Sequence, residues 1–215
     1  MNKGIFNIYK PNGPTSHDMV DKVRKLSGER RIGHAGTLDP LASGVLVVAV
    51  GREFTKQINT IVKKEKEYVS EFTFGMTSTT DDEEGEKTEI STSPVILTDI
   101  KKALKKFEGE VLQTPPDFSA VKISGKTAYQ LSRQGKSVEL QPKKVLIKKN
   151  EIISYNWPIL KLKITTGPGV YIRAIARDLG NELKCGAYMS ELTRTRVGDY
   201  RISDSIKIAT PVSSR

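Results

Sequence analysis

The chain has few of the residues that build disulfides and metal clusters. Among its 215 residues there are one cysteine, Cys185, and two histidines, His17 and His34. A single cysteine cannot form a disulfide within the chain, which is typical of proteins from a reducing compartment. One cysteine and two histidines cannot assemble a zinc cluster. The composition therefore argues against a disulfide scaffold and a metal site.

Long apolar segments are lacking as well. The longest apolar run is Val45–Val50, six residues, whereas a membrane-spanning helix needs about 20. The first residues, MNKGIFNIYKPNG, contain no apolar stretch of the kind found in signal peptides. We therefore expect a soluble protein of the cytoplasm.

Positive charge is abundant. Lysine and arginine number 35 against 25 acidic residues, a formal net charge of +10. The charges are segregated: 122–149 holds eight basic residues and one acid, and 81–89 holds six acids and one lysine. Such an excess on one segment favours a polyanionic partner, most often nucleic acid, over the alternative of a merely solvated basic surface.

Local patterns predict a mixture of helices and strands. Three helices are expected, from Thr15 or Ser16 to Leu26, from a Thr98 cap to Gly109, and from Tyr171 to Leu183. Strands are expected at 44–50, 67–74 and 160–165, with a polar loop at 77–93 and a long loop with a short helix at 113–142. Strands and helices do not alternate regularly, so we predict an α+β fold with a mixed, largely antiparallel sheet flanked by helices.

The segment GHAGTLDPLASG, Gly33–Gly44, is the strongest candidate for chemistry. It places the carboxylate of Asp39 before Pro40, which disfavours helical backbone at Asp39. Its glycines allow another backbone or a ligand to come close. An ordinary turn is the alternative interpretation, because Asp-Pro and glycine are common turn signals.

Five segments together resemble the motifs of the TruB-type pseudouridine synthases. In chain order they are KPNGPTS (10–16), GHAGTLDPLASGVLVV (33–48), KEYVSEFTFG (66–75), TPPDFSAVKISGKTAYQLSRQG (114–135) and GVYIRAIARDLG (169–180). The resemblance runs from about Gly4 to Tyr200. It implies the pseudouridine synthase fold, with an RNA-binding loop insertion at about 113–142, and conversion of uridine 55 in the T-loop of tRNA to pseudouridine without a cofactor or a metal.

The resemblance also implies three catalytic residues. Asp39 occupies the place of the family's catalytic aspartate, which attacks C1′ of the ribose, attacks C6 of the ring, or assists a glycal intermediate. Arg173 matches the arginine that pairs with this aspartate and keeps it charged. Tyr68 matches the tyrosine that stacks on the target base and assists proton transfer. The target base must leave the RNA stack to reach Asp39.

Further residues are expected to bind the substrate. His34 matches a histidine that accommodates the displaced RNA, and Lys10 belongs to the motif that buttresses the active-site loop. Leu192 matches an apolar residue of the base pocket. The remaining candidates for contact with RNA are Tyr171, Asp81, Lys122, Lys126, Tyr129, Arg133, Arg194 and Arg196. In LTRTRVG, Thr193 stands where the family often has a basic residue, so one RNA contact is expected to be missing.

The chain is expected to be a single catalytic domain over residues 1–215 without the C-terminal PUA domain of many family members. It is expected to act on the T-arm of tRNA as a monomer, without a protein partner. Two alternatives remain open from the sequence: a guide-RNA-dependent synthase subunit, and a non-catalytic module that binds or folds tRNA. The second has no need for Asp39, Tyr68 and Arg173 together.

Overall fold

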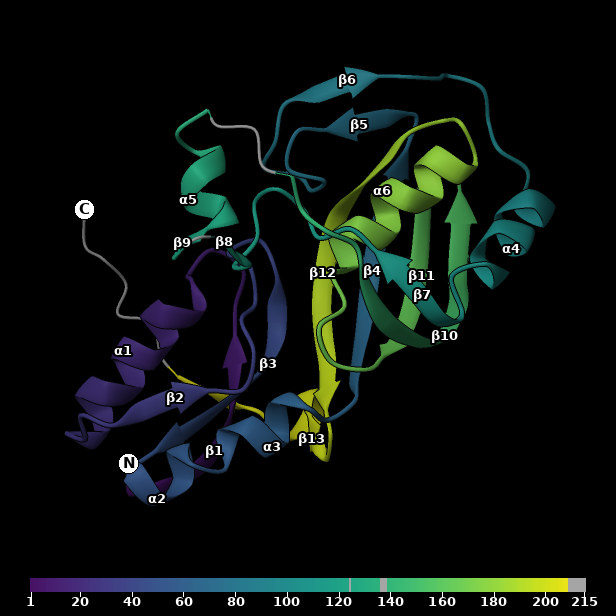
Figure 1. The fold of residues 1–215 in the computed structure, drawn as a ribbon. Coiled ribbons are helices and arrows are strands. Elements are labelled where there is room, and N and C mark those ends of the chain that lie inside the picture. The colour runs from purple at the N-terminus through teal and green to yellow at the C-terminus, as the bar shows by residue number, and fades with distance from the viewer. Residues whose placement is uncertain (124, 136–138, 209–215) are drawn as a thin grey trace, which may run out of the picture. The chain divides into compact units, whose positions relative to one another are not determined.

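The computed structural model describes residues 1–123, 125–135 and 139–208 (Figure 1). Its contacts define two compact units. The first unit comprises Met1–Tyr68 and the chain from Leu192 onward, and the second comprises Val69–Glu191. The chain passes from one unit to the other within strands β4 (Lys66–Phe74) and β12 (Ala187–Val197). The expectation of a single catalytic domain stays a prediction.

The first unit is built around strand β3 (Ser43–Val50). Strand β1 (Gly4–Lys10) pairs with β3 antiparallel along its whole length, and β2 (Ile32–His34) pairs with the end of β3. The start of β3 pairs in parallel with β12 at Thr193 and Arg194. At the edge of the sheet, β14 (Ile206–Lys207) pairs in parallel with β1. Strand β13 (Tyr200–Arg201) pairs antiparallel with β12, and the 3-10 turn Ile202–Asp204 comes directly after it in the chain.

Both faces of β3 are buried. Helix α1 (Ser16–Ser27) packs Met19 and Val23 on the face that carries Leu46, Val48 and Val50. Helix α3 (Ile58–Val62), which follows the short α2 (Arg52–Thr55), packs Ile61 on the face of Val45 and Val47. Burial on both faces explains the continuous apolar run, and the strand predicted at 44–50 is confirmed.

Helix α1 has the ends that the sequence predicts. The Thr15 side chain accepts a hydrogen bond from the Asp18 N–H, and the Asp18 carboxylate accepts one from the Thr15 N–H, at 3.0 and 2.7 Å. This reciprocal cap satisfies two amides that have no partner within the helix. Gly28 ends the helix in the left-handed region with φ 68°.

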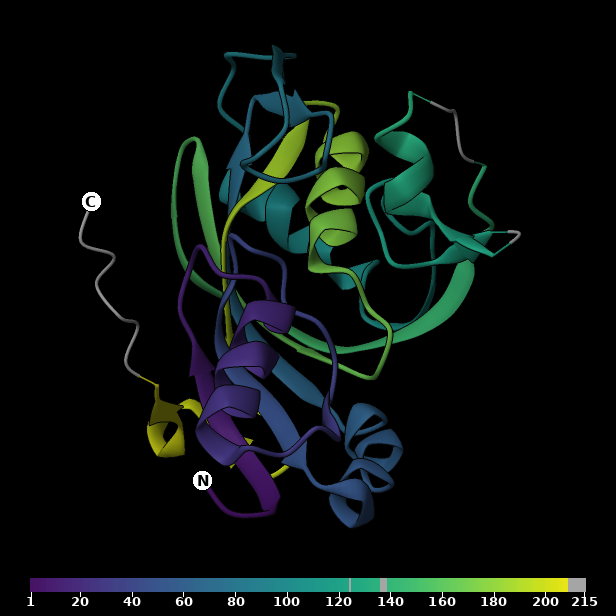
Figure 2. The same ribbon diagram turned by 90° about the vertical axis from the view of Figure 1, so that its left-hand side faces the viewer.

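The second unit contains an antiparallel group of strands, β10 (Lys143–Asn156) between β11 (Ile159–Thr166) and β7 (Gly109–Gln113). Helices α4 (Leu97–Lys105) and α6 (Ile172–Glu182) lie on the same side of the β10–β11 hairpin (Figures 1 and 2). Leu160, Leu162 and Ile164 alternate along β11 and are fully buried. The predicted α+β fold with a largely antiparallel sheet is confirmed.

Some local predictions were wrong. Helix α4 begins after Ile96, so Thr98 lies inside it and does not cap it. The expected loop at 77–93 contains a hairpin of β5 (Met76–Ser78) and β6 (Lys87–Glu89). The long loop at 113–142 contains a second hairpin, β8 (Lys122–Ile123) with β9 (Lys126–Thr127), before α5 (Ala128–Ser132).

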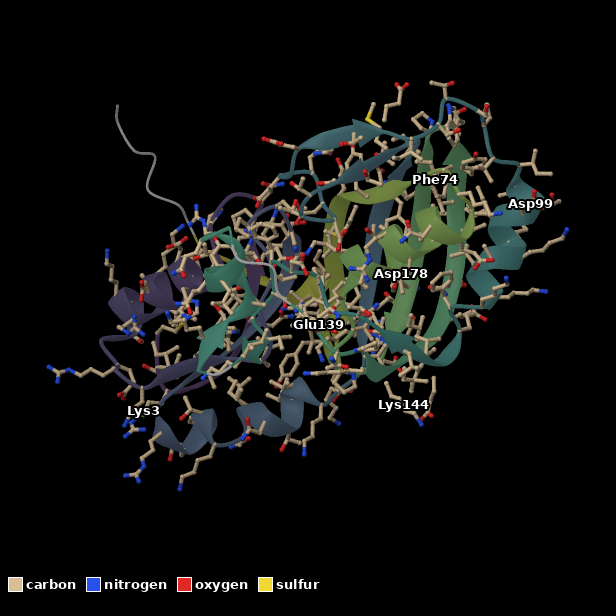
Figure 3. All side chains as sticks on the ribbon, turned by 45° about the horizontal axis from the view of Figure 1, so that its top comes forward. Lys3, Phe74, Asp99, Glu139, Lys144 and Asp178 are labelled. Carbon is tan, nitrogen blue, oxygen red and sulfur yellow. The ribbon has the colours of Figure 1, made fainter. Side chains whose placement is uncertain are left out.

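Strand β10 was not predicted, because its many exposed lysines hide the alternation of a half-buried strand. Lys144 is exposed and directed away from the ribbon (Figure 3), whereas Ile147 is completely buried. No helix in the described part of the chain is long and apolar enough to cross a membrane.

Candidate active site

The loop that carries Asp39 is fixed on both sides of that residue. Before it, the Ser16 hydroxyl accepts a hydrogen bond from the Leu38 N–H and donates one to the Leu38 carbonyl, at 2.8 and 2.9 Å. After it, the Lys10 ammonium donates to the carbonyl oxygens of Pro40 and Ala42. Ser16 and Lys10 are 1% and 0% exposed. The backbone on either side of the partly buried Asp39 therefore has little freedom.

Gly44 lets strand β12 come close to the end of this loop. Its φ is 108°, and a Cβ atom built there would lie 2.2 Å from the Arg194 carbonyl oxygen. A side chain at this position would be both strained and in collision with the backbone of β12. The glycine therefore sets the position of Arg194 beside the loop.

The Arg194 side chain turns inward and is only 1% exposed. Its Nε donates to the Val45 carbonyl at 2.8 Å, and its two terminal nitrogens donate to the carbonyls of Gly36 and Thr37 at 3.1 and 3.3 Å. We expected this arginine to contact RNA, and that prediction was wrong, because a buried guanidinium bonded to backbone cannot reach a phosphate on the surface.

Arg194 is electrostatically coupled to Tyr68 and Asp39. Burial lowers the pKa of Arg194, and the charge and hydrogen bond of Tyr68, followed by the charge of Asp39, oppose that shift. Burial raises the pKa of the Tyr68 phenol, while the charge of Arg194 and its hydrogen bond to the hydroxyl lower it. The first unit thus gathers a carboxylate, a phenol and a guanidinium, and the first two are groups that can transfer a proton.

A second buried cation lies next to Arg194. The Lys66 ammonium donates to the carbonyls of Val62 and Lys64 at 2.7 and 2.8 Å, and the side chain is nearly buried. A Cβ on Gly36 would touch both Lys66 and Arg194, at 3.9 and 3.7 Å. Burial lowers the pKa of Lys66 to about 8, and the Arg194 charge adds to this effect.

Two more expected members of the site in this unit are His34 and Leu192. His34 is partly buried at the end of β2, and its ring meets the ring of His17 edge to face at 5.7 Å between centroids. Burial lowers the pKa of His34, followed by the charge of His17, so the neutral imidazole is favoured at pH 7. Leu192 is 8% exposed in β12.

Arg173 lies in the second unit, on the first turn of α6. It is bound by Asp82 at 3.3 Å between Nη1 and Oδ2, and it donates to the carbonyls of Thr80 and Phe118, both at 3.1 Å. The side chains of Arg173 and Asp82 are 7% and 4% exposed. A surface position for Arg173 is therefore excluded, and the network fixes the direction of its guanidinium.

Asp81, which we expected at an RNA contact, has a different role from its neighbour. Its carboxylate pairs with Arg177 at 2.9 Å, and burial raises its pKa to about 6 in spite of that guanidinium. Tyr171, also expected to contact substrate, caps α6, and its backbone exchanges two hydrogen bonds with the Gln113 side chain.

The segment 113–135 presents its basic side chains to solvent. Lys122, Lys126 and Arg133 are exposed, and the Arg133 guanidinium lies over the half-exposed Tyr129 ring at 5.4 Å. Phe118 meets the other edge of that ring. An exposed aromatic ring beside cations is the arrangement that single-stranded RNA bases stack on.

Two further predicted RNA contacts have internal partners. Arg196 pairs with Glu65 and donates to the Gly198 carbonyl, with its side chain 18% exposed. Lys10, which we expected among the substrate-binding residues, is completely buried, and its ammonium bonds to the Asp39 loop. Its role as a buttress of that loop stays a prediction.

Sequence reasoning missed three buried polar residues: Ser16, Lys66 and Asp82. Asp82 stands beside Asp81 in the same acidic run, and only the fold reveals which carboxylate faces Arg173. Lys66 opens the KEYVSEFTFG motif, and its alternation with Tyr68 and Phe72 was the signal that could have found it. Within the described residues, no group of three or more His, Cys, Asp or Glu side chains is arranged to hold a metal ion.

Comparisons with known proteins agree with one another. The family model "TruB family pseudouridylate synthase (N terminal domain)" matches residues 24–172, and "tRNA pseudouridylate synthase B C-terminal domain" matches residues 173–210. The protein named tRNA pseudouridine synthase B from Protochlamydia amoebophila (strain UWE25) is 45% identical over 204 residues, which cover 95% of this chain and 78% of the relative. The protein of the same name from Endomicrobium trichonymphae is 42% identical over 205 residues, 95% of this chain and 89% of the relative.

Among solved structures, the chain resembles one titled "Crystal Structure of a Cbf5-Nop10-Gar1 Complex", with a TM-score of 0.75 and 30% sequence identity. The similarity covers 95% of this chain and 52% of that chain. A second, titled "Structure of H/ACA RNP bound to a substrate RNA containing 2'-deoxyuridine", has a TM-score of 0.70 and 27% identity.

Proposed function

Because the chain belongs to the TruB family of pseudouridylate synthases, we propose that it converts uridine 55 in the T-loop of tRNA to pseudouridine, with Asp39 as the catalytic carboxylate. The observation that carries the proposal is the Asp39 loop. Ser16 and Lys10 hold the backbone on either side of Asp39, and Arg194 and Tyr68 interact electrostatically with its side chain.

The reaction is an isomerisation and uses only groups that the chain carries. The C1′–N1 bond of the uridine breaks, the uracil turns, and C5 bonds to C1′. The hydrogen on C5 leaves as a proton and N1 gains one, so atoms and electrons balance. Asp39 would attack C1′ or C6, or assist a glycal route. A fixed carboxylate serves each of these routes, because orientation lowers the barrier of every step in which it takes part.

Tyr68 and Arg173 would complete the catalytic set. Tyr68 offers a ring on which the extruded uracil can stack and a hydroxyl that can pass a proton. Arg173 stands at the place of the family's catalytic arginine. Its direction within its own unit is set by Asp82, Thr80 and Phe118.

The RNA would be bound chiefly by the basic segment 113–135. Lys122, Lys126 and Arg133 would contact phosphates, and Tyr129 would stack on an unpaired base. Relatives that are 40–45% identical carry the name tRNA pseudouridine synthase B, which supports tRNA as the substrate. For this reason we favour an enzyme that needs no guide RNA or protein partner over a guide-dependent subunit.

Release of tritium from tRNA transcribed with [5-³H]uridine tests the proposal, because pseudouridine formation removes the C5 hydrogen. The purified chain should release about one tritium per tRNA, and a transcript with cytidine at position 55 should release none. Asp39→Asn should abolish release while RNA affinity changes by less than about tenfold, or ~1.4 kcal/mol. Release that needs an added guide RNA, or turnover by Asp39→Asn, would contradict the proposal.

A further inference from the structure

The guanidinium of Arg194 lies where three parts of the first unit meet. It is carried by β12, it bonds to the carbonyls of Gly36 and Thr37 in the Asp39 loop and to Val45 at the start of β3, and it hydrogen-bonds to the Tyr68 hydroxyl of β4. Only the planar fork of an arginine offers donors in this many directions. One side chain therefore links the loop to the tyrosine.

Burial of the Arg194 charge is energetically unfavourable by itself. A guanidinium removed from water loses its hydration, and hydrogen bonds together with a nearby anion offset that loss. The backbone carbonyls supply the bonds, and Asp39 is the carboxylate that acts on Arg194. An apolar residue of similar volume would leave these three carbonyls without their donor and would remove the charge beside Asp39.

The other ionisable groups around Arg194 are mostly cationic or neutral. Lys66 and Tyr68 face it from β4, His34 faces it from the end of β2, and Asp39 faces it from the loop. Lys10 of β1 bonds to the same loop beyond Asp39. The charged groups that surround the Asp39 carboxylate in this unit are thus cations.

We infer that Arg194 is a positioning residue of the active site: it holds the turn before Asp39 and the Tyr68 hydroxyl in place and supplies the positive charge beside the carboxylate. The inference deepens the proposed function and rests on it. Arg194 touches neither substrate nor reacting atoms in this role, and it acts through Asp39 and Tyr68.

The test compares Arg194→Gln, which removes the charge, with Arg194→Lys, which keeps the charge and loses the fork. Thr193→Val is the matched control, because it removes a neutral hydrogen bond, Thr193 to Ser43 at 2.9 Å, from the same junction of β12 and β3. Single-turnover rates at saturating tRNA are measured from pH 5 to 9, together with RNA affinity at several salt concentrations.

We expect Arg194→Gln to lower the rate at pH 7 at least a hundredfold and to move the acidic limb of the pH–rate profile to higher pH by at least half a unit. The rate of Arg194→Lys at pH 7 should be at least tenfold higher than that of Arg194→Gln. RNA affinity should stay within threefold for both variants, with an unchanged salt slope. Thr193→Val should leave the acidic limb in place, because a purely structural change at this junction does not alter the charge beside Asp39.

Two results would overturn the inference. One is a salt slope reduced by ~0.7 to 0.9 with an unchanged rate at saturating tRNA, since this is the mark of a lost phosphate contact. The other is a reduced rate with an unmoved acidic limb and no rescue by lysine, which a packing role alone would give.

Hydrogen exchange provides a readout that does not depend on activity. Amides of residues 33–44 should exchange faster in Arg194→Gln than in Thr193→Val. If the wild-type chain releases no tritium but this difference is seen, the proposed function fails while the holding of the loop stands. Equal exchange in the two variants would contradict the inference even in an active enzyme.

Discussion

The Ser16 hydroxyl is bonded to both the N–H and the carbonyl of Leu38, so the first residue of α1 fixes the residue before Asp39. The two residues are 22 positions apart, and both are buried. A helix is a more rigid support than a loop. The geometry of the Asp39 loop therefore depends on a buried hydroxyl.

Ser16→Ala should slow catalysis without weakening RNA binding. The change leaves the buried N–H and carbonyl of Leu38 without this partner, which costs about 1–3 kcal/mol of unfolding free energy. Single-turnover rates should fall more than tenfold with an unchanged Kd. Ser190→Ala is the control, because it also removes one hydroxyl–carbonyl bond, to Glu71 at 3.2 Å, in the other unit. Equal rates for the two variants would contradict this prediction.

Asp82→Asn should destabilise the chain more than Asp81→Asn. Asp82 pairs with Arg173 with both side chains buried, whereas the pair of Asp81 and Arg177 is more exposed. Removing one partner of a buried pair costs about 3–5 kcal/mol, and we expect about 1 kcal/mol at the more exposed pair. Urea unfolding at pH 7 measures both. The reverse order would show that Asp81 carries the structural pairing.

Replacing Lys122, Lys126 and Arg133 together by alanine should weaken tRNA binding and reduce its salt dependence. Each lost phosphate contact lowers the slope of log K against log salt by ~0.7 to 0.9. The control replaces Lys101, Lys102 and Lys105 of α4 by alanine, the same change in charge on the same unit. If both triple variants lose affinity equally, net charge and not the segment 113–135 determines binding.

The stability contributed by Lys66 should depend on pH. Its pKa is about 8 in the folded chain and 10.5 in the reference state, so between these values the unfolded chain binds more protons. Stability then rises with pH in this window and is lowest, for this group, below pH 8. Relative to Lys66→Met, the wild type should gain up to about 3 kcal/mol between pH 7 and 10.5. A constant difference would mean that Lys66 is not desolvated.

The sequence by itself determined the local elements. The Thr15–Asp18 cap and Gly28 define α1, and the apolar run before Gly51 defines a strand covered on both faces, because caps and burial patterns act over a few residues. The motif around Asp39 also indicated the chemistry. Where local signals were weak, as in the lysine-rich β10 or at the start of α4, the predictions missed.

Tertiary structure alone decided which side chains serve the site. In the sequence Arg194 is one of two arginines in LTRTRVG, and it is buried only because β12 runs beside β3, about 150 residues earlier in the chain. Tertiary structure likewise decided that Asp82, and not Asp81, pairs with Arg173, and that the Ser16 hydroxyl bonds to Leu38. These choices depend on contacts between distant segments, whose pairing follows from packing the whole core and leaves no mark in the neighbouring residues.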